Sequence, residues 1–266
     1  MKKVFLLDGH ALIFRMYYAF LRRPMINSKG IDTSILFGFT KYILDLIKRE
    51  SPTHLAVAFD PPAKTFRHEI YPEYKATRSA TPELVKEALE PLTEIVKSLG
   101  IPVFMVPGFE ADDVIGSLAK LLEMRGFDTY MVTPDKDYGQ LVSDHIFQYK
   151  PGKSSEENII IDKEYIKAQY NIEDPLQVID ILTIWGDASD NVKGVTSVGE
   201  VGAKKLIAKY KSVENIYEHL DELTPKLKSS FIDAKEHIAL SKYLVTIKSD
   251  IEMEILYLRF GFTDDG

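Results

Sequence analysis

Short runs of β-branched and aliphatic residues alternate along the chain with longer stretches whose apolar positions recur at helical spacing. The short runs predict buried strands at 4–8, 54–60, 101–108 and 127–135. The helical spacing predicts helices at 35–50, 81–100 and 110–126. Pro91 is expected to break or kink the second of these helices. Strands that alternate with helices in this way are typical of an α/β layer fold.

The pattern changes in the last third of the chain. Two short apolar runs, 146–150 and 158–162, are expected to form a pair of strands at a sheet edge. From about residue 171 the sequence reads as short amphipathic helices separated by turns. We therefore predict an α/β core over residues 1–170 and a helical module over residues 171–266.

Composition narrows the class of protein. The chain has 266 residues, of which 45% are hydrophobic and 27% charged, as in ordinary globular proteins. It has no cysteine, which excludes disulfides and thiolate metal sites. The apolar N-terminal run is interrupted by Asp8, and no apolar stretch approaches the roughly 20 residues that cross a bilayer. We expect a cytoplasmic protein without a membrane partner.

Acidic residues stand where the predicted strands end. Because the carboxyl ends of strands in an open α/β sheet line one crevice, these side chains are expected to converge. Two more acids follow in the helical module, in the segment GDASDN. The set comprises Asp8, Asp60, Glu110, Asp112, Asp113, Asp135, Asp137, Asp187 and Asp190.

Nine carboxylates in one cleft need cations to stay ionised. Each acid alone could be a helix N-cap or a turn residue, but independent caps need not all fall on the same side of a sheet. Hard oxygen ligands suit Mg²⁺ or Mn²⁺, and two such ions about 4 Å apart can clamp the reacting oxygens of a phosphodiester. The nine acids also account for the net charge of −7, since the rest of the chain carries +2.

Two basic segments suit nucleic acid. The run 64–78 mixes Lys and Arg, among them Arg67, with aromatic residues, and it reads either as a solvated loop or as a contact for a single strand. The segment 191–211 has a local charge of +4 and contains the turn GVTSVG before a helix expected to begin near Gly202. Backbone N–H groups at such a helix start, with Lys204 and Lys205, are suited to a duplex backbone. An ordinary helical hairpin with a basic face is the alternative.

Six ordered blocks of sequence resemble the 5′ nuclease (flap endonuclease) family, which includes the N-terminal domain of bacterial DNA polymerase I. The blocks are LLDGHALIFR, AVAFD, FRHEIYPEYKATR, GFEADDVIGSLA, TPDKDYGQL and GDASDNVKGVTSVGEVGAKKL. The resemblance implies a PIN-like, mostly parallel sheet flanked by helices. It also implies a helical arch at about 64–95 and a helix–three-turn–helix in the second module.

The resemblance also implies roles for individual residues. A first metal group would comprise Asp8, Asp60, Glu110, Asp112 and Asp113, and a second Asp135, Asp137, Asp187 and Asp190. Lys75 and Arg78 match the basic pair of the arch, which stabilises charge on the scissile phosphate. Further DNA contacts are expected from Arg15, Arg67, Tyr74, Lys193, Ser197, Gly199, Gly202, Lys204 and Lys205. The implied cofactors are two Mg²⁺ ions, for which Mn²⁺ can substitute, and a K⁺ ion at the helix–three-turn–helix.

The turn departs from the usual family pattern, G-V-x-G-I-G-x-K-T-A. Ser197 replaces a glycine, Val201 a lysine and Gly202 a threonine. We expect weaker or more salt-sensitive duplex binding, and the K⁺ site is left open. The sequence ends at FGFTDDG without a polymerase or proofreading module, so we expect a free-standing protein or an excised domain.

These observations predict a monomeric, structure-specific 5′ nuclease that acts in replication and repair. It would hydrolyse DNA at 5′ ends, nicks or flap junctions by a two-metal mechanism. One alternative is a PIN-like ribonuclease, which would need no duplex-gripping module. Another is a non-catalytic branched-DNA binding protein, in which some of the nine acids would be expected to be missing. A small-molecule phosphohydrolase is disfavoured because LLDGH lacks the second Asp of a phospho-aspartate mechanism.

Overall fold

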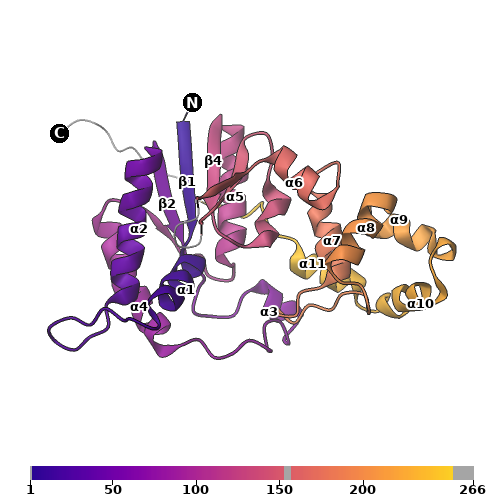
Figure 1. The fold of residues 1–266 in the computed structure, drawn as a ribbon, viewed down its shortest axis with the longest axis horizontal. Coiled ribbons are helices and arrows are strands. Elements are labelled where there is room, and N and C mark those ends of the chain that lie inside the picture. Colours follow the sequence, from indigo (N-terminus) through magenta and orange to yellow (C-terminus); the bar gives the residue numbers. More distant parts are fainter. Residues whose placement is uncertain (1, 153–156, 254–266) are drawn as a thin grey trace.

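A computed structural model describes residues 2–152 and 157–253 of the chain. The final residues of the predicted helical module, 254–266, lie outside this range. In the described part, six strands form one sheet in the order β3-β2-β1-β4-β5-β6 (Figure 1). The strands are β1 (Lys2–Asp8), β2 (His54–Ala58), β3 (Val103–Phe104), β4 (Phe127–Val132), β5 (Ile146–Lys150) and β6 (Ile159–Ile161). The first five are parallel, and β6 pairs antiparallel with β5, as the sequence predicted for the edge.

The sheet positions the acids through its topology. β1 pairs with β2 on one side and with β4 on the other, so the strand order reverses at β1. The crevice at such a switch point, outside the carboxyl ends of the strands, is where ligands bind in open α/β sheets. Asp8 ends β1 at this point. The predicted convergence therefore begins at the centre of the sheet.

Helices cover both faces of the sheet. The helices of the first half of the chain are α1 (Gly9–Phe20), α2 (Ser34–Glu50), α3 (Phe66–Ile70), α4 (Glu83–Ser98) and α5 (Ala111–Met124). Alternate residues of β1 point to opposite faces: Phe5 and Leu7 pack with α1, α2 and α4, whereas Val4 and Leu6 pack with α5. Figure 1 shows α1, α2 and α4 grouped on one side of the strands.

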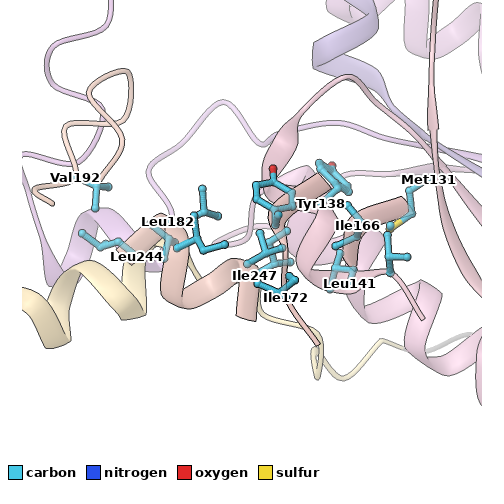
Figure 2. Close-up of a cluster of buried hydrophobic side chains, with 14 of the residues drawn as sticks. Met131, Tyr138, Leu141, Ile166, Ile172, Leu182, Val192, Leu244 and Ile247 are labelled. Carbon is cyan, nitrogen blue, oxygen red and sulfur yellow. The ribbon is translucent and has the colours of Figure 1, made fainter. Parts of the chain in front are cut away.

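The helical module shares its core with the sheet. Its described elements are α7 (Gln177–Trp185), α8 (Glu200–Tyr210), α9 (Val213–Glu218), η2 (Leu220–Glu222), α10 (Pro225–Ala234) and α11 (Ile238–Val245). The helix α6 (Lys163–Tyr170) comes just before the module, and the 3₁₀ helix η1 (Lys136–Leu141) precedes β5. One cluster of buried side chains runs from Met131 on β4 through Tyr138 to Leu182 on α7 and Leu244 on α11 (Figure 2). The module therefore packs directly on the α/β core.

Two predicted elements differ in the structure. The strand expected at 101–108 is reduced to Val103–Phe104, because Pro102 and Pro107 cannot donate to a ladder and β2 is the only strand it pairs with among the described residues. Pro91 does not break its helix: α4 is continuous, and Val85, Ala88, Leu92 and Val96 bury one face of it.

The predicted arch is shorter than expected. Residues 83–95 of the segment 64–95 lie in α4, which packs against α1 and α2 in the core. Only α3 and the turns at 71–82 lie over the acidic end of the sheet. In the part of the chain that the structure describes, no helix is long and apolar enough to cross a membrane.

Candidate active site

Asp8 both ends β1 and begins the next helix. Its Oδ1 accepts a hydrogen bond from the backbone N–H of Ala11 at 3.1 Å, so Asp8 is the N-cap of α1. Its Oδ2 accepts hydrogen bonds from the hydroxyls of Thr133 (3.2 Å) and Tyr138 (3.0 Å). Burial, with the neighbouring charge of Asp60, raises the pKa of Asp8 to about 7. A cation would be needed to hold this carboxylate fully ionised at neutral pH.

Asp60 follows β2 and faces the start of α5. Its Oδ1 accepts the N–H of Ala111 at 2.7 Å, and its own N–H donates to Nδ1 of His10 at 3.0 Å. Burial lowers the pKa of His10, so the ring is neutral and accepts this bond. His10 thus holds the backbone at Asp60, which is an ordinary polar role.

Three carboxylates gather at the first turn of α5. Glu110, Asp112 and Asp113 each offer one oxygen, and these oxygens lie within 4.8 Å of one another. Glu110 is buried and is contacted by Lys75 and by the hydroxyl of Tyr74. The positive charges of Lys75 and Arg67 lower its pKa although burial alone would raise it. Glu110 is therefore a carboxylate in this arrangement.

Asp112 differs from its neighbours in having an oxygen without a partner. Its Oδ1 is buried and makes no hydrogen bond. Burial and the charge of Asp113 raise its pKa well above the usual range. Oδ1 of Asp137 is also buried and accepts no hydrogen bond, although Nζ of Lys136 lies 3.5 Å from it, and burial and Asp135 raise the pKa of Asp137 to about 7. A buried oxygen without a donor is expected where a cation belongs.

The second acid group meets the first at a cavity of about 50 Å³. Asp135 ends the loop after β4 and caps η1 through the N–H of Asp137, at 2.9 Å. Asp187 accepts from Nζ of Lys136 at 3.2 Å, and this cation and Ser189 hold the pKa of Asp187 below its usual value despite burial. The acids that line the cavity are Asp112, Asp135, Asp137, Asp187 and Asp190.

The residues present fit divalent cations. The donor set consists of hard carboxylate oxygens from four strand ends and one turn of the helical module, as Mg²⁺ or Mn²⁺ prefers. Two of these oxygens, on Asp112 and Asp137, come one from each group and accept no hydrogen bond, and the oxygen of Asp137 lies 3.5 Å from Nζ of Lys136. The arrangement can therefore take up positive charge at both groups.

Lys75 and Arg78 reach into this acidic site. Lys75 contacts Glu110 of the first group, and its backbone N–H donates to the carbonyl of Asp190 at 2.9 Å. Arg78 donates from Nε to Oδ1 of Asp190 at 3.0 Å and to the carbonyl of Ser189 at 3.3 Å. The side chain of Lys75 therefore contacts the first acid group and that of Arg78 contacts the second. Both residues line the cavity.

Two of the predicted DNA contacts, Arg67 and Tyr74, are buried in this structure. Arg67 is 1% exposed and Tyr74 is 5% exposed, so neither side chain can touch DNA in this arrangement. Arg67 instead forms buried ion pairs with Glu110 at 2.6 Å and Asp113 at 2.7 Å. This burial could not be predicted from the local sequence, because basic and aromatic residues also alternate in exposed loops.

The other predicted DNA contacts lie on the turn before α8 and on the first turns of α8, except for Arg15, which lies on α1. Lys193, Ser197, Gly199 and Lys205 are exposed on the turn before α8 and on its first turns, with Gly202 half-buried beside them. Lys204 is half-buried, pairs with Glu200 at 2.8 Å and lies over the ring of Tyr170. Arg15 is half-buried on α1 and bonds to the carbonyl of Gly152. The helix begins at Glu200, two residues earlier than predicted.

Three residues near the acids were missed at the level of sequence. Thr133 and Tyr138 hold Asp8, and Lys136 pairs with Asp187 and lies 3.5 Å from Asp137. All three stand within three residues of Asp135 in the segment TPDKDY. Their closeness to a predicted ligand was the available signal.

Sequence models of one protein family match both parts of the chain. The model described as "5′-3′ exonuclease, N-terminal resolvase-like domain" matches residues 3–171. The model described as "5′-3′ exonuclease, C-terminal SAM fold" matches residues 173–264. The chain belongs to the 5′-3′ exonuclease family. The resemblance expected from the six sequence blocks is thereby confirmed.

Curated relatives of this chain include a 5′-3′ exonuclease and several DNA polymerase I proteins. The 5′-3′ exonuclease of Aquifex aeolicus (strain VF5) is 37% identical over 256 residues, which are 96% of this chain and 85% of that protein. DNA polymerase I of Bacillus caldotenax is 36% identical over 96% of this chain. The match covers 29% of that polymerase, so the chain spans less than a third of its length.

Solved structures share the fold. T5 5′-exonuclease with bound zinc superposes with a TM-score of 0.77 at 23% identity, over 93% of this chain and 90% of that one. The bacteriophage T5 D15 flap endonuclease, in a product complex with DNA and metal ions, gives 0.75 at 22% identity, over 93% and 90%. At these identities the likeness establishes the fold: a parallel-dominated α/β sheet with a C-terminal helical module, as the sequence predicted.

Proposed function

We propose that this chain is a divalent-metal-dependent 5′ nuclease that hydrolyses DNA phosphodiesters at 5′ ends, nicks or flap junctions. One observation carries the proposal: Asp112 and Asp137 each have a buried oxygen that accepts no hydrogen bond, and they belong to two acid groups that meet at one cavity. Family membership supplies the reaction class, and the T5 flap endonuclease complex holds DNA and metal ions in the same fold. The proposed place is replication and repair, since polymerase I relatives carry the same region.

The proposed cofactors are two Mg²⁺ ions, which Mn²⁺ can replace. Bound there, they would supply positive charge and polarised water for attack on a phosphodiester. Asp8, Asp60, Glu110 and Asp112 would hold the ion of the first group. Asp135, Asp137, Asp187 and Asp190 would hold the ion of the second, with Thr133 and Tyr138 orienting Asp8.

Lys75 and Arg78 are proposed to act on the scissile phosphate. Both now neutralise carboxylates, and bound cations would release them from Glu110 and Asp190. Both residues lie outside any helix or strand, since residues 72–82 form turns and loop between α3 and α4. Freed from the acids, the two cations can stabilise the negative charge that develops on the phosphate.

The turn between α7 and α8 is proposed to hold duplex DNA. α8 starts at Glu200 after the exposed Gly199, and its first N–H groups are available to a phosphate. Lys193 and Lys205 stand exposed on either side of this turn. α11 fixes the turn from behind, since His237 contacts the carbonyl of Gly194 at 3.0 Å and Ser241 that of Lys193 at 2.5 Å. Binding of a K⁺ ion at this turn belongs to the same proposal.

The test is a 5′-flap DNA labelled at either end in separate reactions. The full chain is incubated with Mg²⁺, Mn²⁺ or EDTA at low and moderate salt. Metal-dependent cuts near the junction are the expected result. Tight binding without cleavage in any metal would instead identify a branched-DNA binding protein, and a preference for single-stranded RNA would identify a ribonuclease.

A further inference from the structure

The guanidinium of Arg67 uses every N–H group it has. Nε donates to the carbonyl of Leu244 at 2.9 Å, and one terminal nitrogen donates to Oε2 of Glu110 (2.6 Å) and Oδ2 of Asp113 (2.7 Å). The other terminal nitrogen donates to Oδ1 of Asp113 and to the carbonyl of Thr246, both at 2.8 Å. These five bonds match the five donors of arginine. No other side chain could replace the whole set.

Asp113 is saturated in the same way. Its Oδ1 accepts from Arg67 and from the backbone N–H of Lys248 at 2.8 Å. Its Oδ2 accepts from Arg67 and from the backbone N–H of Glu110 at 3.2 Å. A carboxylate has about four acceptor positions, and all of these are taken in a side chain that is 0% exposed. A metal ion would have to displace at least one of these buried donors.

The neighbouring residue provides the contrast. Asp112 has the same side chain and lies one position earlier on α5, yet its Oδ1 has no donor at all. It lines the cavity between the two acid groups, whereas Asp113 does not. The two aspartates therefore have opposite environments: one is open to a cation, and the other is already neutralised by an arginine.

The acceptors of Arg67 tie the end of the helical module to the acids. The segment 244–248 leaves α11 and runs past α5 and η1, where Gln140 also holds the carbonyl of Val245 (2.9 Å) and the N–H of Ile247 (2.8 Å). Leu244 and Ile247 belong to the shared core in Figure 2. The same guanidinium thus contacts a carboxylate of the proposed metal site and the backbone that anchors the helical module.

We propose that Arg67 and Asp113 are a positioning pair, in which Asp113 binds no metal and Arg67 orients Glu110 toward the cleft while fixing segment 244–248. The proposal rests on the proposed function for the metal that Glu110 and Asp112 would hold. It departs from the expectation that Asp113 is a ligand. Residues that orient a metal ligand typically change affinity by about 10- to 100-fold when replaced, without binding the ion themselves.

The test compares Asp112→Asn with Asp113→Asn, which are the same substitution at adjacent positions. Mn²⁺ binding to the full chain is measured calorimetrically without DNA, and thermal unfolding is measured without metal. We expect Asp113→Asn to lower Tm by about 10 °C, because Arg67 keeps a buried charge with too few acceptors. We expect Asp112→Asn to leave Tm nearly unchanged and to raise the Kd for Mn²⁺ about 10-fold more than Asp113→Asn does.

Arg67→Lys keeps the test valid if Asp113→Asn does not fold. A lysine retains the charge but has three donors on one nitrogen, so Glu110 loses its fixed partner. We expect a folded chain with a lower Tm and a Kd for Mn²⁺ raised about 10-fold. Ile207→Ala, a buried change in α8, serves as the control that lowers Tm without altering the Kd.

Two results would contradict the proposed pairing of Arg67 with Asp113, and a third would also contradict the proposed metal site. Equal losses of Mn²⁺ affinity in folded Asp112→Asn and Asp113→Asn would make Asp113 a ligand. An unchanged Kd in folded Arg67→Lys would remove the orienting role of Arg67. If the unaltered chain bound no Mn²⁺, the proposed metal site itself would fail, and the orienting role would fail with it.

Discussion

Lys75 donates its backbone N–H to the carbonyl of Asp190 at 2.9 Å, while its side chain contacts Glu110. Lys75 has a positive φ of 59°, a left-handed conformation that is costly for a residue other than glycine. A single arch residue therefore joins the two acid groups, one through its backbone and one through its ammonium. The ammonium of Lys75 therefore lies at the site where we propose that metal ions and the scissile phosphate bind.

Replacing Lys75 separates these two roles. Lys75→Ala removes an internal counter-ion and a proposed phosphate contact, so we expect Mn²⁺ to bind at least as tightly as before. We expect the single-turnover rate of flap cleavage to fall by about 100-fold or more. Lys86→Ala on α4 is the matched control, because this lysine is exposed and pairs with Glu83 on the same helix, at 3.1 Å. Equal rates for the two variants would exclude the role of Lys75.

Metal stabilisation is expected to grow with pH. Burial, with Asp60 and Asp135 respectively, raises the pKa values of Asp8 and Asp137 to about 7, above the unfolded value near 3.8. A raised folded pKa means that the fold binds extra protons between these values, so these two groups reduce stability as the pH rises from about 4 to 7. Divalent ions need the ionised forms and relieve this cost.

Thermal unfolding with and without Mg²⁺ measures this effect. The rise in Tm on adding Mg²⁺ should be small at about pH 5 and should increase up to about pH 8. A rise in Tm that is independent of pH, or larger in acid, would contradict the assignment of Asp8 and Asp137 to cation binding. Asp250, which is exposed and pairs with Lys248, is the control: Asp250→Asn should leave the trend unchanged.

Parallel topology explains why the site was predictable from sequence. Asp8 and Asp60 stand at the ends of apolar runs that predict buried strands, and parallel strands bring their carboxyl ends together; in the structure β1 ends at Asp8 and β2 ends two residues before Asp60. The burial of Arg67 was not predictable, since two of its acceptors, Leu244 and Thr246, lie about 180 positions later in the chain. The local hydrophobic pattern predicts which residues share a face of a helix or strand. It does not predict which distant backbone groups will contact them.

The departures in the turn have a measurable cost. Ser197 has a positive φ of 67° at a position where the family pattern has glycine. An L-residue in this left-handed region loses about 1 kcal/mol relative to glycine, part of which the greater freedom of unfolded glycine offsets. We expect Ser197→Gly to stabilise the chain by about 0.5 kcal/mol in urea unfolding. A loss of stability would show that the hydroxyl or the local fold matters more than the backbone strain.

Asp135→Asn tests the central claim most directly, because Asp135 ends the loop after β4, lines the cavity and pairs with no cation of the chain within the described residues. The single-turnover rate of 5′-flap cleavage in Mg²⁺ is measured for this variant and for the unaltered chain, with Tm as the check on folding. We predict that the rate falls by at least about 100-fold and that Tm changes little. A folded variant that cleaves at the original rate would remove Asp135 from the metal site and contradict the account.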